Sequence, residues 1–184
     1  SDTDRLLVAA SAVIPIFAFP EWKYKNLDEV LLYPESFNLD FDTSGKNRSI
    51  LGMVGTGYME DKMILSKQAL HMGFKNETDK RNTAIHEFVH LIDMMDGEVD
   101  GIPSILLDQQ QTIPWLMMMD STMMQMMEKE IDIREYGAQN RIEFLAVLAE
   151  YFFERPRLLE KNHPELYAML EQMFKQNMKE RVDG

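Results

Sequence analysis

The chain contains no cysteine, and this absence limits the chemistry that it can perform. Without thiols it can form neither disulfide bonds nor thiolate metal sites. Any zinc ion must therefore be held by histidine and carboxylate side chains. The absence of cysteine also fits a reducing compartment, so we expect a cytoplasmic location.

Basic residues are scarce relative to acidic ones. The chain has 19 Lys and Arg against 31 Asp and Glu, which gives a formal charge of −12 at pH 7. A surface of this charge repels phosphate backbones and anionic lipid surfaces. We therefore expect no direct binding to nucleic acid.

Long apolar runs are absent as well. The longest, LLVAASAVIPIFAF, extends only from Leu6 to Phe19 and is interrupted by Pro15, so it is too short to span a membrane. We expect a buried helix over residues 4–14 that ends at Pro15. The chain begins with Ser-Asp-Thr-Asp and without methionine, so we expect a native N-terminal segment, which could carry a signal or an anchor, to be missing.

The residues that are present suffice for one folded domain over residues 1–184. Apolar residues make up 45% of the chain and charged residues 27%, which is typical of a globular protein. Short apolar stretches at 29–37, stopped by Pro34, and at 62–66 predict strands. Helical spacing predicts four further helices: one from Thr78 to a stop at Gly97, one over 115–131, one over 140–155 before Pro156, and one that starts near Pro164 with Asn162 as its cap.

One stretch, TAIHEFVHLID at residues 83–93, combines two histidines and a glutamate. On a helix, His86 and His90 lie one turn apart on the same face and can present two imidazoles to one ion. Glu87 then lies beside the open coordination position, where it can take a proton from a metal-activated water. This pattern is typical of zinc peptidases.

The alternative is that the two histidines are ordinary packing residues and that the protein binds no metal. Two of the four histidines of the chain fall within this one motif. Burying two imidazoles and a glutamate without a shared role would also cost about 1–3 kcal/mol per unpaired group. We therefore favour a metal site.

A catalytic zinc needs a third protein ligand, and three residues are candidates. Asp96 follows His90 at the spacing used by metzincins, but Asp93 stands where those enzymes need a glycine for a sharp turn. Glu143 and Glu150 lie two turns apart on one face of a later apolar helix, about 10 Å from each other, so one ion cannot bind both. The residues alone leave the choice between these two glutamates open.

Several segments together resemble the Mlc titration factor A (MtfA) family of zinc metallopeptidases. They are RLLVAASAVIPIF, VLLYPESF, IHEFVHLIDMMDGEVDGIP, YGAQNRIEFLAVLAEYFFERPRLLE and HPELYAMLEQMF. The segment with the tyrosine and the glutamate is also similar to the catalytic domain of anthrax lethal factor. The resemblance implies an α+β fold: a mainly helical, zincin-like metalloprotease domain with a small β-sheet packed on the helix of the HExxH motif.

The resemblance also implies roles for individual residues. It selects Glu143, seven residues after Tyr136, as the third zinc ligand, and it implies that Tyr136 donates a proton to the oxyanion of the attacked carbonyl. A carboxylate often orients a metal-bound histidine, and Asp93 and Glu150 are the candidates for this task. Leu91 departs from the family, which commonly has a lysine or a similar residue there.

Two functions are compatible with this site. The first is a zinc peptidase acting on peptides or proteins, including the possibility of an aminopeptidase, with the strand at 62–66 as an edge that pairs with the substrate. The second is a binding protein with little turnover that captures a partner, because the family is named for binding a transcriptional repressor of sugar uptake. The methionine-rich segment 117–127 is expected to be mainly core filler, the alternative being a groove for a partner.

Overall fold

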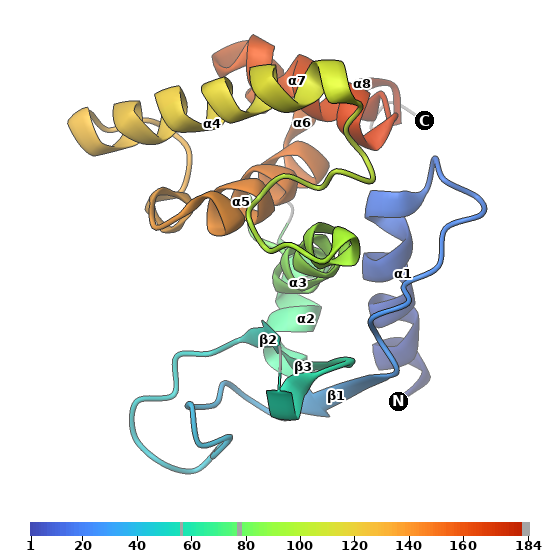
Figure 1. Ribbon diagram of the computed structural model, residues 1–184. Coiled ribbons are helices and arrows are strands. Elements are labelled where there is room, and N and C mark those ends of the chain that lie inside the picture. The colour runs from blue at the N-terminus through green and yellow to red at the C-terminus, as the bar shows by residue number, and fades with distance from the viewer. Residues whose placement is uncertain (56, 77–78, 182–184) are drawn as a thin grey trace.

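A computed structural model describes residues 1–55, 57–76 and 79–181. The chain folds into a mainly helical α+β structure with a small sheet, as the sequence predicts. The sheet lies at the bottom of Figure 1, α3 crosses the middle, and α5 and α4 lie above it. The helix with the HExxH motif is thus placed between the sheet and the C-terminal helices.

The sheet consists of β1 (Glu29–Tyr33), β2 (Gly52–Val54) and β3 (Lys62–Ser66) within the described residues, in the order β1-β3-β2. β3 is parallel to β1 and antiparallel to β2, so it is the central strand, and the prediction that it forms a free edge is wrong. Its consecutive apolar residues Met63, Ile64 and Leu65 are all buried, as expected for a strand covered on both faces. The short strand β2, which was not predicted, is the edge nearest α3.

The first helix, α1 (Asp2–Ile16), contains Pro15 within its last turn, so the prediction that this proline ends the helix is wrong. The last carbonyl groups of a helix lack partners inside it. The buried Gln176 amide donates hydrogen bonds to the carbonyl oxygens of Ile14 and Pro15 and so stabilises this end.

The metal-motif helix, α3 (Thr83–Asp93), follows α2 (Lys67–Lys75), which was not predicted. Asn82 caps α3 by accepting a hydrogen bond from the N–H of Ile85. The predicted start at Thr78 lies outside the described residues. After the 3-10 turn η2 (Met94–Asp96), Gly97 adopts a φ of 95° and stops the helix, as predicted.

The C-terminal part of the chain is helical: α4 (Gln109–Glu128), η3 (Glu135–Ala138), α5 (Arg141–Glu154), α6 (Pro156–Asn162), α7 (Pro164–Phe174) and α8 (Met178–Arg181). α4 starts before the predicted residue 115 because Asp108 and Gln111 form a capping box. Asn162 is not a cap, since it ends the unpredicted α6 and His163 takes the cap position of α7. Pro164 opens α7 as predicted.

α3 contributes to two hydrophobic clusters at once. Ile85, Val89 and Ile92 face the larger cluster, which includes most of α5. Residues Ala84, Phe88 and Leu91 face the smaller cluster, which includes Met63 and Leu65 of β3. Burial on both sides fixes the rotation of α3 about its axis, and with it the direction of its histidines.

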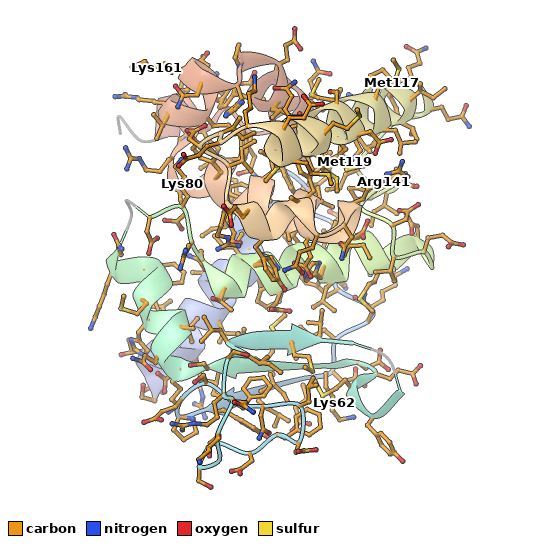
Figure 2. The ribbon with its side chains drawn as sticks, turned by 90° about the vertical axis from the view of Figure 1, so that its left-hand side faces the viewer. Lys62, Lys80, Met117, Met119, Arg141 and Lys161 are labelled. Carbon is orange, nitrogen blue, oxygen red and sulfur yellow. The ribbon has the colours of Figure 1, made fainter. Side chains whose placement is uncertain are left out.

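The methionines of α4 divide between interior and surface. Met119 is fully buried, whereas Met117, Met124 and Met127 are 69%, 62% and 80% exposed. Figure 2 shows Met119 on the side of α4 that faces α5 and Met117 on the opposite side. The prediction of core filler is thus correct for Met119 and wrong for these three exposed residues.

In the part of the chain that the structure describes, none of the helices has the length and apolar character needed to cross a membrane.

Candidate metal centre

The two histidines of the motif lie together at the buried middle of α3. The ring centroids of His86 and His90 are 4.6 Å apart, and the rings are nearly perpendicular. Their side chains are about nine-tenths buried, with 9% and 11% of their surface exposed. The one-turn spacing of the motif therefore produces the pair that the sequence predicts.

Glu143 extends to the same point from the first turn of α5. Its Oε2 lies 2.9 Å from Nε2 of His86 and 3.6 Å from Nε2 of His90. One ligand atom from each of the three residues lies within 4.8 Å of the other two. Two imidazoles and one carboxylate are a common ligand set of catalytic zinc sites, so the residues present fit a metal ion.

The three predicted ligands contact one another in a way that favours charged forms. Burial opposes a positive charge on His86, but hydrogen bonds to Glu143 and Glu150 outweigh it and raise the pKa of this imidazole to about 10. Burial also acts to raise the pKa of the Glu143 carboxyl, but hydrogen bonds from the two imidazoles hold it well below its usual range. A divalent cation would replace this proton-mediated contact between the ligands.

Glu87 lies next to the ligands and against the edge strand. It is 6% exposed, and burial raises the pKa of its carboxyl, while His86 and His90 act in the opposite direction. A Cβ atom added to Gly52 of β2 would lie 2.7 Å from Cγ and from Oε1 of Glu87, and 2.8 Å from Cγ2 of Thr83. Only a residue without a side chain allows β2 to lie this close to Glu87.

Glu150, two turns after Glu143 on α5, holds His86 from behind. Its Oε1 lies 2.6 Å from Nδ1 of His86, and its side chain is almost completely buried. Its Oε2 accepts a hydrogen bond of 2.7 Å from the backbone N–H of Asn82. The Arg134 guanidinium donates to both carboxylate oxygens, at 2.5 and 3.4 Å.

Arg134 and Asn82 are residues that the sequence reasoning missed. Asn82 caps α3 with its side chain and contacts Glu150 with its backbone, so it joins the start of α3 to α5. A signal for Arg134 does exist, because a glutamate on the apolar face of a helix needs a cationic partner. Nothing in the sequence identifies which arginine supplies the partner.

Asp93, the other candidate for orienting a histidine, contacts the loop after α3. It is fully buried, and its Oδ2 accepts a hydrogen bond of 2.9 Å from the N–H of Gly101. Its Oδ1 has no hydrogen-bond partner among the described residues, and burial raises the pKa of the carboxyl to about 6. Asp96 accepts hydrogen bonds from the backbone N–H groups of Glu98 and Ser104.

Tyr136 lies in η3 beside the ligands. Its ring centroid is 6.0 Å from that of His86, and the Arg134 guanidinium lies 5.7 Å from it on the face of the ring. Burial and the negative charges of Glu143 and Glu87 raise the pKa of its phenol. The hydroxyl therefore keeps its proton at neutral pH, as a hydrogen-bond donor must.

A cleft of about 520 Å³ opens beside these residues. Residues 49–52 form one wall, and the start of α3 with Arg81, Thr83, His86 and Glu87 forms another. Arg134, Tyr136 and Glu150 complete it. A ligand in this cleft would contact both the edge of the sheet and the candidate catalytic residues.

The sequence matches a model of the glucose-regulated metallo-peptidase M90 family over residues 1–175. The chain belongs to this family. It is therefore a metallopeptidase-like protein, and the three grouped ligands support a metal cofactor.

Relatives named Mlc titration factor A support the same assignment. The protein of this name from Pectobacterium atrosepticum is 27% identical over 96% of the chain, and that from Escherichia fergusonii is 30% identical over 85%. An uncharacterized protein of Synechocystis is 30% identical over 95% of the chain. The matched regions cover 70%, 62% and 66% of these three relatives, so the chain spans about two thirds of their length.

Proposed function

We propose that the protein is a zinc-dependent peptidase that hydrolyses peptide bonds with Glu87 as general base. The observation that carries this proposal is the meeting of His86, His90 and Glu143 within 4.8 Å, with Glu87 beside them and facing the cleft. Family membership supports it. Zinc is the metal we propose because catalytic zinc is often bound by two histidines and a glutamate.

The roles follow from where each side chain lies. When bound, zinc supplies Lewis-acid activation of a water molecule and of the substrate carbonyl. Glu87 accepts the proton of the attacking water at its carboxylate and passes it to the leaving amine. The Tyr136 hydroxyl donates to the oxygen of the attacked carbonyl as that oxygen becomes negative.

Glu150 acts on the reaction through His86. By accepting from Nδ1–H, it keeps the proton on Nδ1, so that the imidazole gives up its other proton and binds the metal through Nε2, which faces Glu143. We assign this positioning role to Glu150, since the hydrogen bond shown for Asp93 goes to Gly101.

An extended substrate would pair with β2. The sequence had suggested β3 instead. β3 has a neighbour on each side, whereas β2 is an edge strand whose Gly52 packs against Glu87. A strand that adds to this edge would bring its backbone past the metal ligands. This placement rests on the cleft lined by residues 49–52.

The test is a comparison of wild type with Glu87→Gln on internally quenched peptides and on aminoacyl anilides, together with elemental analysis of bound metal. We expect about one zinc per chain in both proteins and loss of turnover by about 100-fold or more in the variant. Cleavage of the anilides would indicate an aminopeptidase, and cleavage of the quenched peptides alone an endopeptidase. Equal turnover in both proteins would refute the role of Glu87.

A second candidate function is favoured by the names of the relatives, which say that those proteins titrate Mlc. In this proposal the chain binds a transcriptional regulator in the cytoplasm, and the metal serves to maintain the shape of the domain. The expected result is zinc binding with negligible turnover, and binding to the regulator that Glu87→Gln leaves unchanged. Turnover that Glu87→Gln abolishes would favour the peptidase.

A further inference from the structure

Two arginines line the cleft beside the candidate metal centre, and they differ in what they bind. The Arg134 guanidinium is committed to Glu150 through two hydrogen bonds. The Arg81 side chain is exposed and has no hydrogen bond or ion pair with any other part of the described chain. Arg81 is thus a cation whose charge is available to a ligand in the cleft.

The backbone that carries Arg81 is held firmly. Its N–H donates to Oδ1 of Asp79 at 3.1 Å. In the next residue, the Asn82 N–H donates to Glu150, and the Asn82 carbonyl accepts from the N–H of His86 at 2.9 Å. The Arg81 side chain therefore starts from a point that is fixed relative to the metal ligands.

On the side of this cleft, the charges that face Arg81 leave room for an anion. Arg81 also borders a neighbouring cavity of about 340 Å³ lined by Glu130, Asp132 and Glu135, and within the described chain it forms no ion pair with them. Of the acidic residues lining the same cleft, Glu150 is bonded to Arg134 and His86, and Glu87 is buried against Gly52. Asp79 is the nearest acidic residue along the chain, and its carboxylate oxygens accept from Asn76 and from the Arg81 N–H. The first turn of α3 contains no acidic residue, and a helix N-terminus favours negative charge.

We propose that Arg81 is a specificity-determining residue that binds a carboxylate of the peptide substrate. This inference rests on the proposed peptidase function and names the class of substrate: peptides with a carboxylate close to the cleaved bond. The opposite wall of the cleft includes Ile50 and the 45% exposed Leu51, which suit apolar parts of the same peptide. In a chain with a net charge of −12, an unpaired cation at this place offsets the general repulsion of acidic peptides.

The test uses internally quenched peptides that differ at one position on either side of the cleaved bond, with Glu, Gln or Lys there. For wild type we expect kcat/KM for the Glu peptide to exceed that for the Gln peptide by about tenfold, the effect of one charged hydrogen bond. Arg81→Ala should remove the difference, and Arg81→Glu should make the Lys peptide the best substrate. Equal rates on all three peptides, together with no Arg81-dependent effect of amidating the C-terminus, would overturn the proposal. So would a Glu preference that Arg81→Glu leaves unchanged.

Lys161→Glu is the matched control. Lys161 is exposed in α6, which Figure 2 places at the opposite end of the molecule from the sheet. This variant changes the net charge by the same amount as Arg81→Glu, so it separates a local contact from a long-range field. It should keep the wild-type preference, and an inverted preference in this control would contradict a specific contact with Arg81.

The carboxylate could belong to an acidic side chain or to the C-terminus of the peptide. Each peptide is therefore measured with a free and with an amidated C-terminus. A Glu preference that persists after amidation identifies the side chain, whereas an Arg81-dependent loss of rate on amidation, equal for the three peptides, identifies the C-terminus. Both results support the role of Arg81.

A binding measurement separates failure of this inference from failure of the proposed function. Fluorescence anisotropy of the labelled Glu and Gln peptides with Glu87→Gln, and with Glu87→Gln combined with Arg81→Ala, needs no turnover. If wild type hydrolyses none of the peptides but the Glu peptide binds in a way that depends on Arg81, the peptidase proposal is refuted and the carboxylate site is supported. Hydrolysis with no Arg81-dependent preference, either for the Glu residue or for a free C-terminus, would keep the peptidase and refute the site.

Discussion

Oε1 of Glu150 lies 2.6 Å from Nδ1 of His86, and both side chains are buried. A carboxylate at Nδ1 keeps a proton on that nitrogen, so the proton that a metal displaces is the one on Nε2, which faces Glu143. We therefore propose that this glutamate determines which nitrogen is offered to a metal.

Changing Glu150 to Gln should weaken metal binding. The amide can donate to Nδ1 and so favour the wrong tautomer, and loss of such an outer contact lowers metal affinity by about 10- to 100-fold. Competition with a chromogenic zinc chelator measures this change. Glu128→Gln, at the exposed end of α4, is the control and should bind zinc like wild type.

Arg134→Met should destabilise the fold, because it removes the guanidinium that bonds to both oxygens of the buried Glu150 carboxylate. We expect a loss of about 2–4 kcal/mol in the free energy of unfolding, measured by urea denaturation of metal-free protein. Arg141→Met breaks the Asp120 pair, in which both side chains are nearly half exposed, and should cost much less stability. Equal losses in the free energy of unfolding of the two variants would contradict a stabilising role for the buried Arg134–Glu150 pair.

Gly52→Ala should impair catalysis with little effect on metal content. Its Cβ would lie 2.7 Å from Glu87 and 2.8 Å from Thr83, so the base or the strand must move. We expect kcat to fall by about tenfold or more, since a misplaced catalytic group loses much of its effect. Gly55→Ala is the control, because among the described residues its Cβ would meet only Met59, at 3.4 Å. In this variant kcat should stay at the wild-type value.

Asp93→Asn should change how stability depends on pH. Burial raises the pKa of Asp93 to about 6 in the folded protein, so the folded state binds this proton more tightly than the unfolded state does. The protonated Asp93 therefore contributes to the free energy of unfolding at low pH. This contribution is lost as pH rises through about 6, which lowers the free energy of unfolding by about 1–2 kcal/mol.

The asparagine variant lacks this titration and can still accept from the Gly101 N–H. Urea denaturation of metal-free protein at about pH 4.5 and about pH 7.5 compares the two proteins. The free energy of unfolding of the variant, relative to that of wild type, should be larger at the higher pH than at the lower pH. If the difference in free energy of unfolding between the two proteins does not change with pH, the titration of Asp93 is not its cause.

Met119→Ala and Met117→Ala should differ sharply in stability. Met119 is fully buried, so truncation leaves a cavity and should cost about 2–5 kcal/mol. Met117 is 69% exposed, and its truncation should change the free energy of unfolding by less than about 0.5 kcal/mol. Thermal denaturation of both variants checks this, and a similar loss in both would place Met117 in the interior.

Periodicity and motif spacing predicted the parts of the fold that obey local rules. The HExxH spacing identified α3, and the apolar pattern of residues 141–154 identified α5. The three-residue β2 was missed because so short a strand has no measurable alternation and depends on pairing with β3. The incorrect prediction that β3 is an edge strand has a related cause, since the order of strands in a sheet is set by contacts between distant segments.

At the candidate site, sequence spacing predicted which residues meet on one helix, and the resemblance chose between two glutamates of another helix. From the residues alone, Glu143 and Glu150 were equivalent; in the fold one faces Nε2 and the other Nδ1 of the same imidazole. Arg134 and Gly52 were not identified, since their importance depends on groups that are remote in the chain. The likeness to anthrax lethal factor stays a prediction.

The sharing of α3 between two hydrophobic clusters has a consequence for hydrogen exchange. Because Ile85 and Val89 pack toward α5 while Phe88 and Leu91 pack toward the sheet, neither half of the molecule can open without exposing one face of this helix. The amide protons of α3 should then exchange with solvent only through global unfolding, the slowest route that a protein has. The two histidines would then lie in the segment of the chain that opens least often.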